Sequence, residues 1–152
     1  MLYQTDVVDA VRRYLVANGY NIDEKATTAT KGYDLIAFME SGQTPIKLVV
    51  KARGATSAQP GSARYGKPFD RSQVAIHVAE VFYKAAEALS FKNSKYQISA
   101  AIALPKNKDY EDYVLKIRST IRKLGVTIFF VDDTGKVEVP MAHEINDKEL
   151  RA

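Results

Sequence analysis

Apolar residues recur every three to four positions in three segments of the chain, which is the spacing that places them on one face of a helix. These segments predict helices near residues 5–19, 69–91 and 109–124. The first and third end at glycines, Gly19 and Gly125, as helices commonly do. The second stripe is the clearest, and its apolar members are Val74, Val78, Val81, Ala85 and Leu89.

Shorter apolar runs predict β-strands. The stretches YDLIAFM (residues 33–39) and PIKLVVKA (45–52) are joined by the polar segment ESGQT, which is typical of a hairpin turn. The stretches YQISAAIAL (96–104) and VTIFFVDD (126–133) are almost continuously apolar, as expected for strands in the middle of a sheet. We therefore expect an antiparallel hairpin and two buried strands.

Two weaker patterns complete the set of elements. The threonine-rich residues 22–30 predict an edge strand, and KVEV at 136–139 predicts a short last strand. The resulting order is α-β-β-β-α-β-α-β-β. A hairpin followed by alternating helices and strands predicts an α/β fold with a mixed central sheet flanked by helices. We expect a single domain over residues 1–140, followed by a loosely attached C-terminal tail at 141–152.

The composition narrows the class of protein. The chain has 152 residues, of which 46% are hydrophobic and 26% charged, as in ordinary soluble globular proteins. It contains no cysteine, which excludes disulfides, thiolate metal sites and a cysteine nucleophile. No apolar run approaches the roughly 20 residues of a membrane helix, and no secretory signal is visible. These features predict a cytoplasmic protein without a membrane partner.

Positive charge is concentrated in one segment. Residues 51–71 carry five cations against the single acid Asp70, so their net charge of +4 equals that of the whole chain. Part of this segment, TSAQPGSARYGKP, is a long loop without apolar periodicity, and such loops are often functional. Clustered positive charge is typical of a surface that binds phosphate groups, although a solvated basic loop explains it equally well.

The predicted hairpin places two charged residues side by side. Pairing the strands about the turn puts Asp34 opposite Val50 or Lys51. Val49 shares one face of its strand with Lys51. Taken alone, such an aspartate–lysine pair is an ordinary half-exposed ion pair.

The element order, together with GYDLIAF and IKLVVKA, resembles the core of the PD-(D/E)XK, or restriction-endonuclease-like, nuclease superfamily over about residues 1–131. That core has an α-β-β-β-α-β layout, an aspartate near the start of its second strand and a (D/E)-x-K tripeptide on its third. By this resemblance Asp34 corresponds to the metal-binding aspartate. Lys51 corresponds to the motif lysine, which orients the attacking water or offsets charge in the transition state. Val49 stands where the family has Asp or Glu.

The resemblance implies Mg²⁺ as cofactor, and the loss of one carboxylate would weaken its binding. A migrated second metal ligand is available on the following helix in Glu80, and Gln73 resembles the helical glutamine that relatives place beside the metal. Glu80 is also suited to an ordinary exposed pair with the lysine four residues later. Asp6 or Asp9 of the first helix is a further source of an acid, although both also suit the first turns of a helix.

We therefore expect a nucleic-acid-binding protein, with DNA as partner, whose Mg²⁺-dependent phosphodiesterase site is impaired or rearranged. One alternative is a non-catalytic protein-interaction or subunit domain on the same scaffold, and the other is an active nuclease that uses Glu80. A homodimer is compatible with each of these. The expected contacts to nucleic acid are Arg53, Arg64, Tyr65, Lys67, Arg71 and His77.

Overall fold

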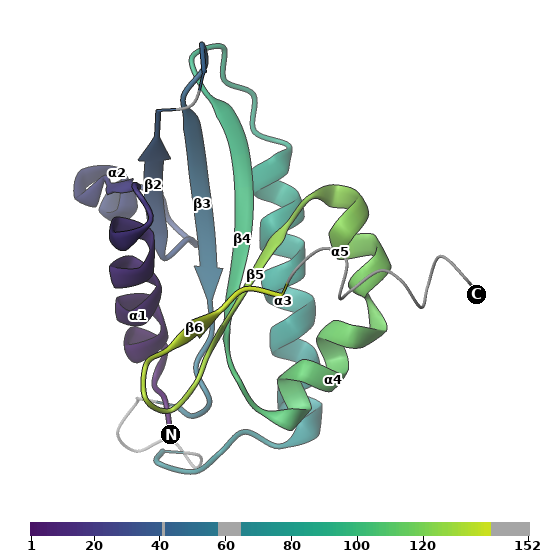
Figure 1. Ribbon diagram of the computed structural model, residues 1–152. Coiled ribbons are helices and arrows are strands. Elements are labelled where there is room, and N and C mark those ends of the chain that lie inside the picture. Colours follow the sequence, from purple (N-terminus) through teal and green to yellow (C-terminus); the bar gives the residue numbers. More distant parts are fainter. Residues whose placement is uncertain (41, 58–64, 141–152) are drawn as a thin grey trace.

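The computed structural model describes residues 1–40, 42–57 and 65–140 (Figure 1). A twisted six-stranded mixed sheet, in the order β1-β2-β3-β4-β5-β6, separates one long helix on one face from the other four helices on the opposite face. The strands are β1 (Asn21–Ile22), β2 (Leu35–Met39), β3 (Ile46–Ala52), β4 (Gln97–Pro105), β5 (Thr127–Val131) and β6 (Val137–Glu138). The helices are α1 (Gln4–Ala17), α2 (Glu24–Ala29), α3 (Arg71–Leu89), α4 (Lys108–Lys116) and α5 (Arg118–Leu124).

The strand directions follow from the connections. The short turn between β2 and β3 makes them antiparallel, whereas the helical crossovers make β3, β4 and β5 parallel. β1 and β6 pair antiparallel with β2 and β5 at the two edges of the sheet. The predictions of a hairpin and of a central strand over YQISAAIAL are confirmed, because β4 lies between β3 and β5.

Alternating side chains of the strands form a core on each face of the sheet. On the α1 side, Leu48 and Val50 of β3 pack in one cluster with Val11 and Leu15 of α1. On the α3 side, Val49 belongs to a second cluster, which contains the predicted α3 stripe of Val74, Val78, Val81 and Ala85 and residues of α4, α5, β4 and β5. The expectation of a mixed sheet with helices on both faces is therefore confirmed.

The prediction of an edge strand over residues 22–30 was wrong. Only Asn21–Ile22 is a strand, and Glu24–Ala29 forms α2. The Asp23 side chain caps this helix by accepting a hydrogen bond from the backbone N–H of Ala26 at 2.8 Å. The hydroxyl of Thr27 accepts a hydrogen bond from the backbone N–H of Ile36 in β2. A cap and a tertiary contact thus override the strand preference of threonine.

The single helix predicted over 109–124 is divided in two. The backbone of Ile117 leaves the helical conformation, with φ −117° and ψ 15°, and separates α4 from α5. Ile117 itself packs against the core on the α3 side, as do Val114 before the break and Ile121 after it. The apolar stripe was recognised correctly, but the change of helix direction has no signal in its spacing.

In the described part of the chain, no helix is both long and apolar enough to cross a membrane. The tail expected at residues 141–152 and the candidate Arg64 lie outside the described residues.

Candidate functional site

Asp34 and Lys51 lie side by side at the ends of adjacent strands. Leu35 pairs with Val50, and this register places Asp34, one residue before β2, next to Lys51 near the end of β3. The Nζ atom of Lys51 is 3.7 Å from Oδ2 of Asp34, and the two side chains are only 13% and 16% exposed. The proximity expected from the hairpin is therefore confirmed, and the pair is more buried than an ordinary surface ion pair.

The Asp34 carboxylate also accepts two hydrogen bonds. Its Oδ2 accepts from the backbone N–H of Ala52 at 2.7 Å, and its Oδ1 accepts from Nε2 of Gln4 at 3.0 Å. Asp34 thus connects the start of α1 with the β2–β3 hairpin. Gln4 was not recognised in the sequence, because nothing in the local pattern indicates that the start of α1 reaches this strand end.

Gly54 allows the start of α1 to lie close to the chain that follows β3. A Cβ atom at Gly54 would lie 2.4 Å from the backbone nitrogen of Gln4, closer than such atoms approach in proteins. The backbone N–H of Ala55 also donates a hydrogen bond to the carbonyl of Leu2 at 2.8 Å. Only glycine allows this approach, so the chain after β3 packs directly on the chain before α1.

Val49 lies on the same face of β3 as Lys51 but points into the core. Its side chain is 2% exposed and belongs to the apolar cluster on the α3 side. The position at which the PD-(D/E)XK pattern has a carboxylate is therefore occupied by a well-packed hydrophobic side chain.

Glu80 reaches the end of β3 from α3, where it pairs with Arg53. Nη2 of Arg53 lies 3.3 Å from Oε2 of Glu80, and the side chains are 28% and 41% exposed. The Nε atom of Arg53 is buried and has no hydrogen-bond partner among the described residues. Glu80 thus lies near the predicted site, but its carboxylate is directed to a cation.

His77 forms a buried hydrogen-bond chain between three elements. Its Nδ1 lies 3.1 Å from the hydroxyl of Tyr110 in α4, and that hydroxyl donates to the carbonyl of Gly54 at 2.9 Å. Since the single hydroxyl proton goes to Gly54, we assign the Nδ1–H tautomer to His77. Burial, followed by the nearby positive charge of Arg53, lowers the pKa of His77 to about 4. A neutral, 8% exposed histidine is suited to a structural hydrogen bond. Tyr110 was not among the candidates.

Arg71 and Gln73 are engaged at the start of α3. Arg71 pairs with Asp109 at 2.6 Å and Asp112 at 3.3 Å, and its guanidinium lies over the ring of Tyr113. The Gln73 side chain accepts a hydrogen bond from the backbone N–H of Asp70, which is one half of a capping box. Both residues therefore have local structural roles.

The remaining described candidates, Tyr65 and Lys67, face solvent in the segment that leads to α3. Tyr65 is 48% exposed. A cleft of about 290 Å³ lies beside this segment, near the carboxyl-terminal ends of β3 and β4. Its lining residues are Ala55, Pro68, Phe69, Val74, Asn107, Lys108, Asp109 and Tyr110. Ligands of open α/β sheets commonly bind at the carboxyl ends of parallel strands.

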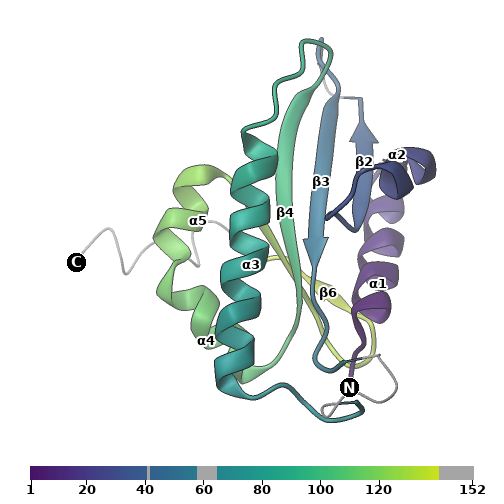
Figure 2. The same cartoon turned by 180° about the vertical axis from the view of Figure 1, so that it is seen from behind.

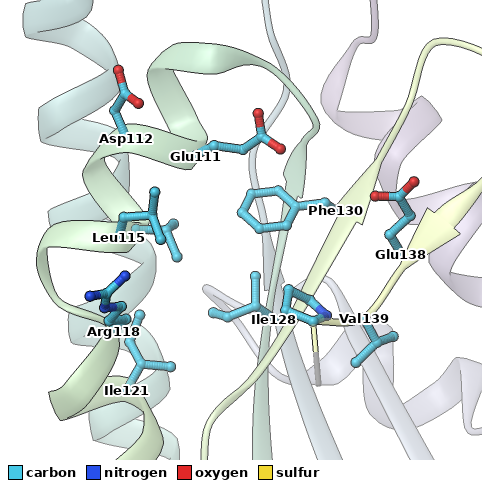
Figure 3. A pocket seen from close by; sticks show the side chains of 11 residues that line it. Glu111, Asp112, Leu115, Arg118, Ile121, Ile128, Phe130, Glu138 and Val139 are labelled. Atoms are coloured by element: carbon cyan, nitrogen blue, oxygen red, sulfur yellow. The ribbon is translucent and has the colours of Figure 1, made fainter. Parts of the chain in front are cut away.

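A larger groove, of about 600 Å³, lies away from these residues, between the α4–α5 segment and the β5–β6 edge (Figure 3). Ile128 and Phe130 form its apolar floor, while Glu111 and Glu138 lie at its rim (Figure 3). The groove contains none of the predicted site residues, so its size alone assigns it no part in the expected chemistry.

The described residues do not form a recognisable metal site. No group of three His, Asp or Glu side chains is arranged to hold a metal ion within residues 1–40, 42–57 and 65–140. Asp34 provides one carboxylate whose oxygens already accept two hydrogen bonds and face Lys51. This donor set does not fit Mg²⁺, which needs an oxygen-rich octahedral shell.

Comparison with known proteins leaves the family open. No protein-family model matches the chain, and no curated protein matches it. Among solved structures, the chain is similar to an XisH family protein from Nostoc punctiforme PCC 73102. The two are 13% identical, the match covers 90% of this chain and 99% of that one, and the TM-score is 0.49. A likeness at this level assigns neither a family nor a function, so the restriction-endonuclease-like order stays a prediction.

Proposed function

We propose that the chain binds nucleic acid at the carboxyl-terminal ends of β3 and β4, and that the chain does not cleave the nucleic acid. The observation that carries the proposal is the largely buried Asp34–Lys51 pair, whose position at the ends of β2 and β3 is the one expected for a nuclease core. The exposed residues Tyr65 and Lys67 lie in the segment beside the cleft at these strand ends. Lysine suits contacts with phosphate, and tyrosine suits stacking on a base.

Ion pairs reduce the number of cations that are available for phosphate. Arg53 is compensated by Glu80, and Arg71 is compensated by Asp109 and Asp112. We therefore assign the phosphate contacts chiefly to Lys67 and to Arg64, which lies outside the described residues. DNA remains the proposed partner.

We expect the affinity for duplex DNA to fall with salt, because about two phosphate contacts predict a slope of log affinity against log salt near −1.8. The Arg64→Ala/Lys67→Ala variant should abolish most of this dependence, and Tyr65→Ala should weaken binding to single strands. Fluorescence anisotropy at several salt concentrations measures both effects.

The matched control is Lys92→Ala/Lys95→Ala, which removes the same charge from the exposed segment between α3 and the start of β4, at the opposite end of the strands (Figure 1). If both double variants weaken binding equally, the contribution is net charge rather than a site. Absence of binding at low salt would favour the protein-interaction alternative. The ion pairs of Arg53 and Arg71 support that alternative, because they leave fewer cations for phosphate.

We expect no Mg²⁺-dependent or Mn²⁺-dependent cleavage of single-stranded or double-stranded DNA by the unmodified protein, because its residues do not fit the metal. Val49→Glu alone should not create activity, since the new carboxylate would enter an apolar cluster and lower stability. Gel assays with both metals test this. Cleavage that disappears in Glu80→Gln would instead show that Glu80 is the migrated acid. Cleavage that survives Asp34→Ala, Lys51→Ala and Glu80→Gln would place the site elsewhere.

A further inference from the structure

The cleft near the ends of β3 and β4 has an apolar lining and the size of a single ring system. It lies where α3 and α4 begin side by side, at the lower end of the sheet, with the segment that leads to α3 running below them (Figure 2). Its apolar lining residues are Ala55, Pro68, Phe69 and Val74. The volume of about 290 Å³ lies just below the roughly 300–1,000 Å³ of pockets for drug-sized ligands.

Hydrogen bonds hold the lining of the cleft to the chain that follows β3. The backbone N–H of Phe69 donates to the carbonyl of Ala55 at 3.0 Å. The ring of Phe69 packs edge-on against His77, with the ring centroids 4.5 Å apart. On the α4 side, the hydroxyl of Tyr110 donates to the carbonyl of Gly54 at 2.9 Å. The cleft is therefore formed before a ligand enters, and binding does not have to order its lining.

The charges around the cleft favour a ring inside it and phosphates outside it. Asp109 belongs to the lining, and its carboxylate pairs with Arg71 at 2.6 Å, so a phosphate in the cleft would lie beside a carboxylate. Lys67 and Lys108, by contrast, are exposed and have no ion pair among the described residues. Lys108 lines the cleft and Lys67 directly precedes Pro68, so both are available to phosphates that flank a bound ring.

Asn107 provides the cleft with an unused hydrogen-bond donor. Its Oδ1 caps α4 by accepting from the backbone N–H of Tyr110 at 3.0 Å, whereas its Nδ2 has no partner in the described part of the chain. The carbonyl oxygens and ring nitrogens at the edge of a nucleobase accept hydrogen bonds from such an amide. A ring with acceptors at its edge and phosphates on both sides is one nucleotide of a strand.

We infer that the cleft receives a single unpaired base, so that the chain prefers single-stranded nucleic acid to a duplex. A base within a duplex is stacked and paired, and it enters a pocket only at the cost of leaving the helix. Tyr65, which is 48% exposed in the segment beside the cleft, is available to stack on the neighbouring base. The inference rests on the proposed function, because it specifies which form of nucleic acid occupies the proposed site.

Fluorescence anisotropy with three DNA probes tests the cleft. The probes are a short oligothymidine, an abasic strand of the same length and a blunt duplex of that length. The two strands carry the same phosphates, so a difference between them reports on the bases. In the Tyr65→Ala variant, which removes the neighbouring stacking platform, the oligothymidine should still bind about ten-fold more tightly than the abasic strand, as expected for one accommodated base. The unmodified protein should bind the oligothymidine more tightly than the duplex.

Two variants change the cleft in different ways. Ala55→Leu fills it and should lower the affinity for the oligothymidine about ten-fold, with the affinity for the abasic strand unchanged. Asn107→Ser removes the amide but keeps a side chain that caps α4, and should lower the same affinity by a smaller factor. The matched control is Ala79→Leu, which adds the same side chain at an exposed position of α3 and should bind like the unmodified protein. Thermal unfolding checks that each variant is folded.

The outcomes separate this inference from the function on which it rests. Equal affinities for the oligothymidine and the abasic strand would overturn the base site and leave nucleic-acid binding intact. The same holds if the base dependence survives in Ala55→Leu and Asn107→Ser, or if the duplex binds more tightly than the oligothymidine. Absence of salt-dependent binding to all three probes would overturn the proposed function, and this inference with it.

Discussion

Replacing Asp34 by alanine is expected to lower the free energy of unfolding by about 3 kcal/mol at neutral pH. The change leaves the Lys51 ammonium, which is only 13% exposed, without its partner. It also removes the acceptor for the backbone N–H of Ala52 and for the Gln4 amide. An unpaired buried group costs its full desolvation, whereas an exposed ion pair contributes less than about 1 kcal/mol. Urea unfolding monitored by circular dichroism measures the difference.

Two companion variants separate the causes. Asp133→Ala removes an 81% exposed carboxylate that lies 3.6 Å from the N-terminal ammonium, and should leave stability almost unchanged. Combining Asp34→Ala with Lys51→Met should cost less than the sum of the single changes, because the second change removes the uncompensated charge. Equal losses in Asp34→Ala and Asp133→Ala would show that the carboxylate is not held as the structure indicates.

Acidification between about pH 6.5 and pH 4 is expected to remove about 3 kcal/mol of stability through His77 alone. The folded-state pKa of this histidine is lowered to about 4, so the unfolded chain binds more protons in this range. Stability is therefore complete above the unfolded pKa and is lost as the pH falls through the window. The cause is burial, together with the charge of Arg53, which outweighs the opposite effect of Glu80 on the same helix.

His77→Gln is the variant that isolates this contribution, because glutamine does not titrate and its amide can still donate to Tyr110. It should be less stable than the unmodified protein at pH 7, but its stability should fall much less between pH 6.5 and pH 4. Glu87 and Asp132 also have lowered pKa values, and they affect both proteins equally at lower pH. Parallel stability curves for the two proteins would contradict the assignment of a neutral buried histidine.

The fold could be predicted largely from the pattern of apolar residues, since α3 buries one regular face and the strands of the β2–β3 hairpin are apolar runs buried on both faces of the sheet. The pairing of the hairpin strands also placed Lys51 beside Asp34, and the alternation of side chains along β3 placed Val49 on the same face as Lys51. The edge-strand prediction failed at α2 because a side-chain cap at Asp23 and one hydroxyl contact from Thr27 decided the conformation. Such single contacts have no periodic signal.

The surroundings of the candidate site were much less predictable than the site itself. Arg53 and Arg71 were expected to face phosphate, but both have acidic partners from other elements. Which charged side chains meet across helices depends on packing angles and on local loop paths, neither of which the sequence spacing specifies. Gln4 and Tyr110 were missed for the same reason, because each reaches the site only through tertiary packing.

The hydrogen bonds of Asp34 have a consequence for how such sequences are interpreted. A carboxylate that accepts from the backbone of a neighbouring strand and from the first helix stabilises the fold, whatever chemistry surrounds it. Selection for stability alone is enough to retain Asp34 at this strand end. An aspartate beside a lysine at the ends of two paired strands is therefore not, by itself, a sign of phosphodiesterase chemistry.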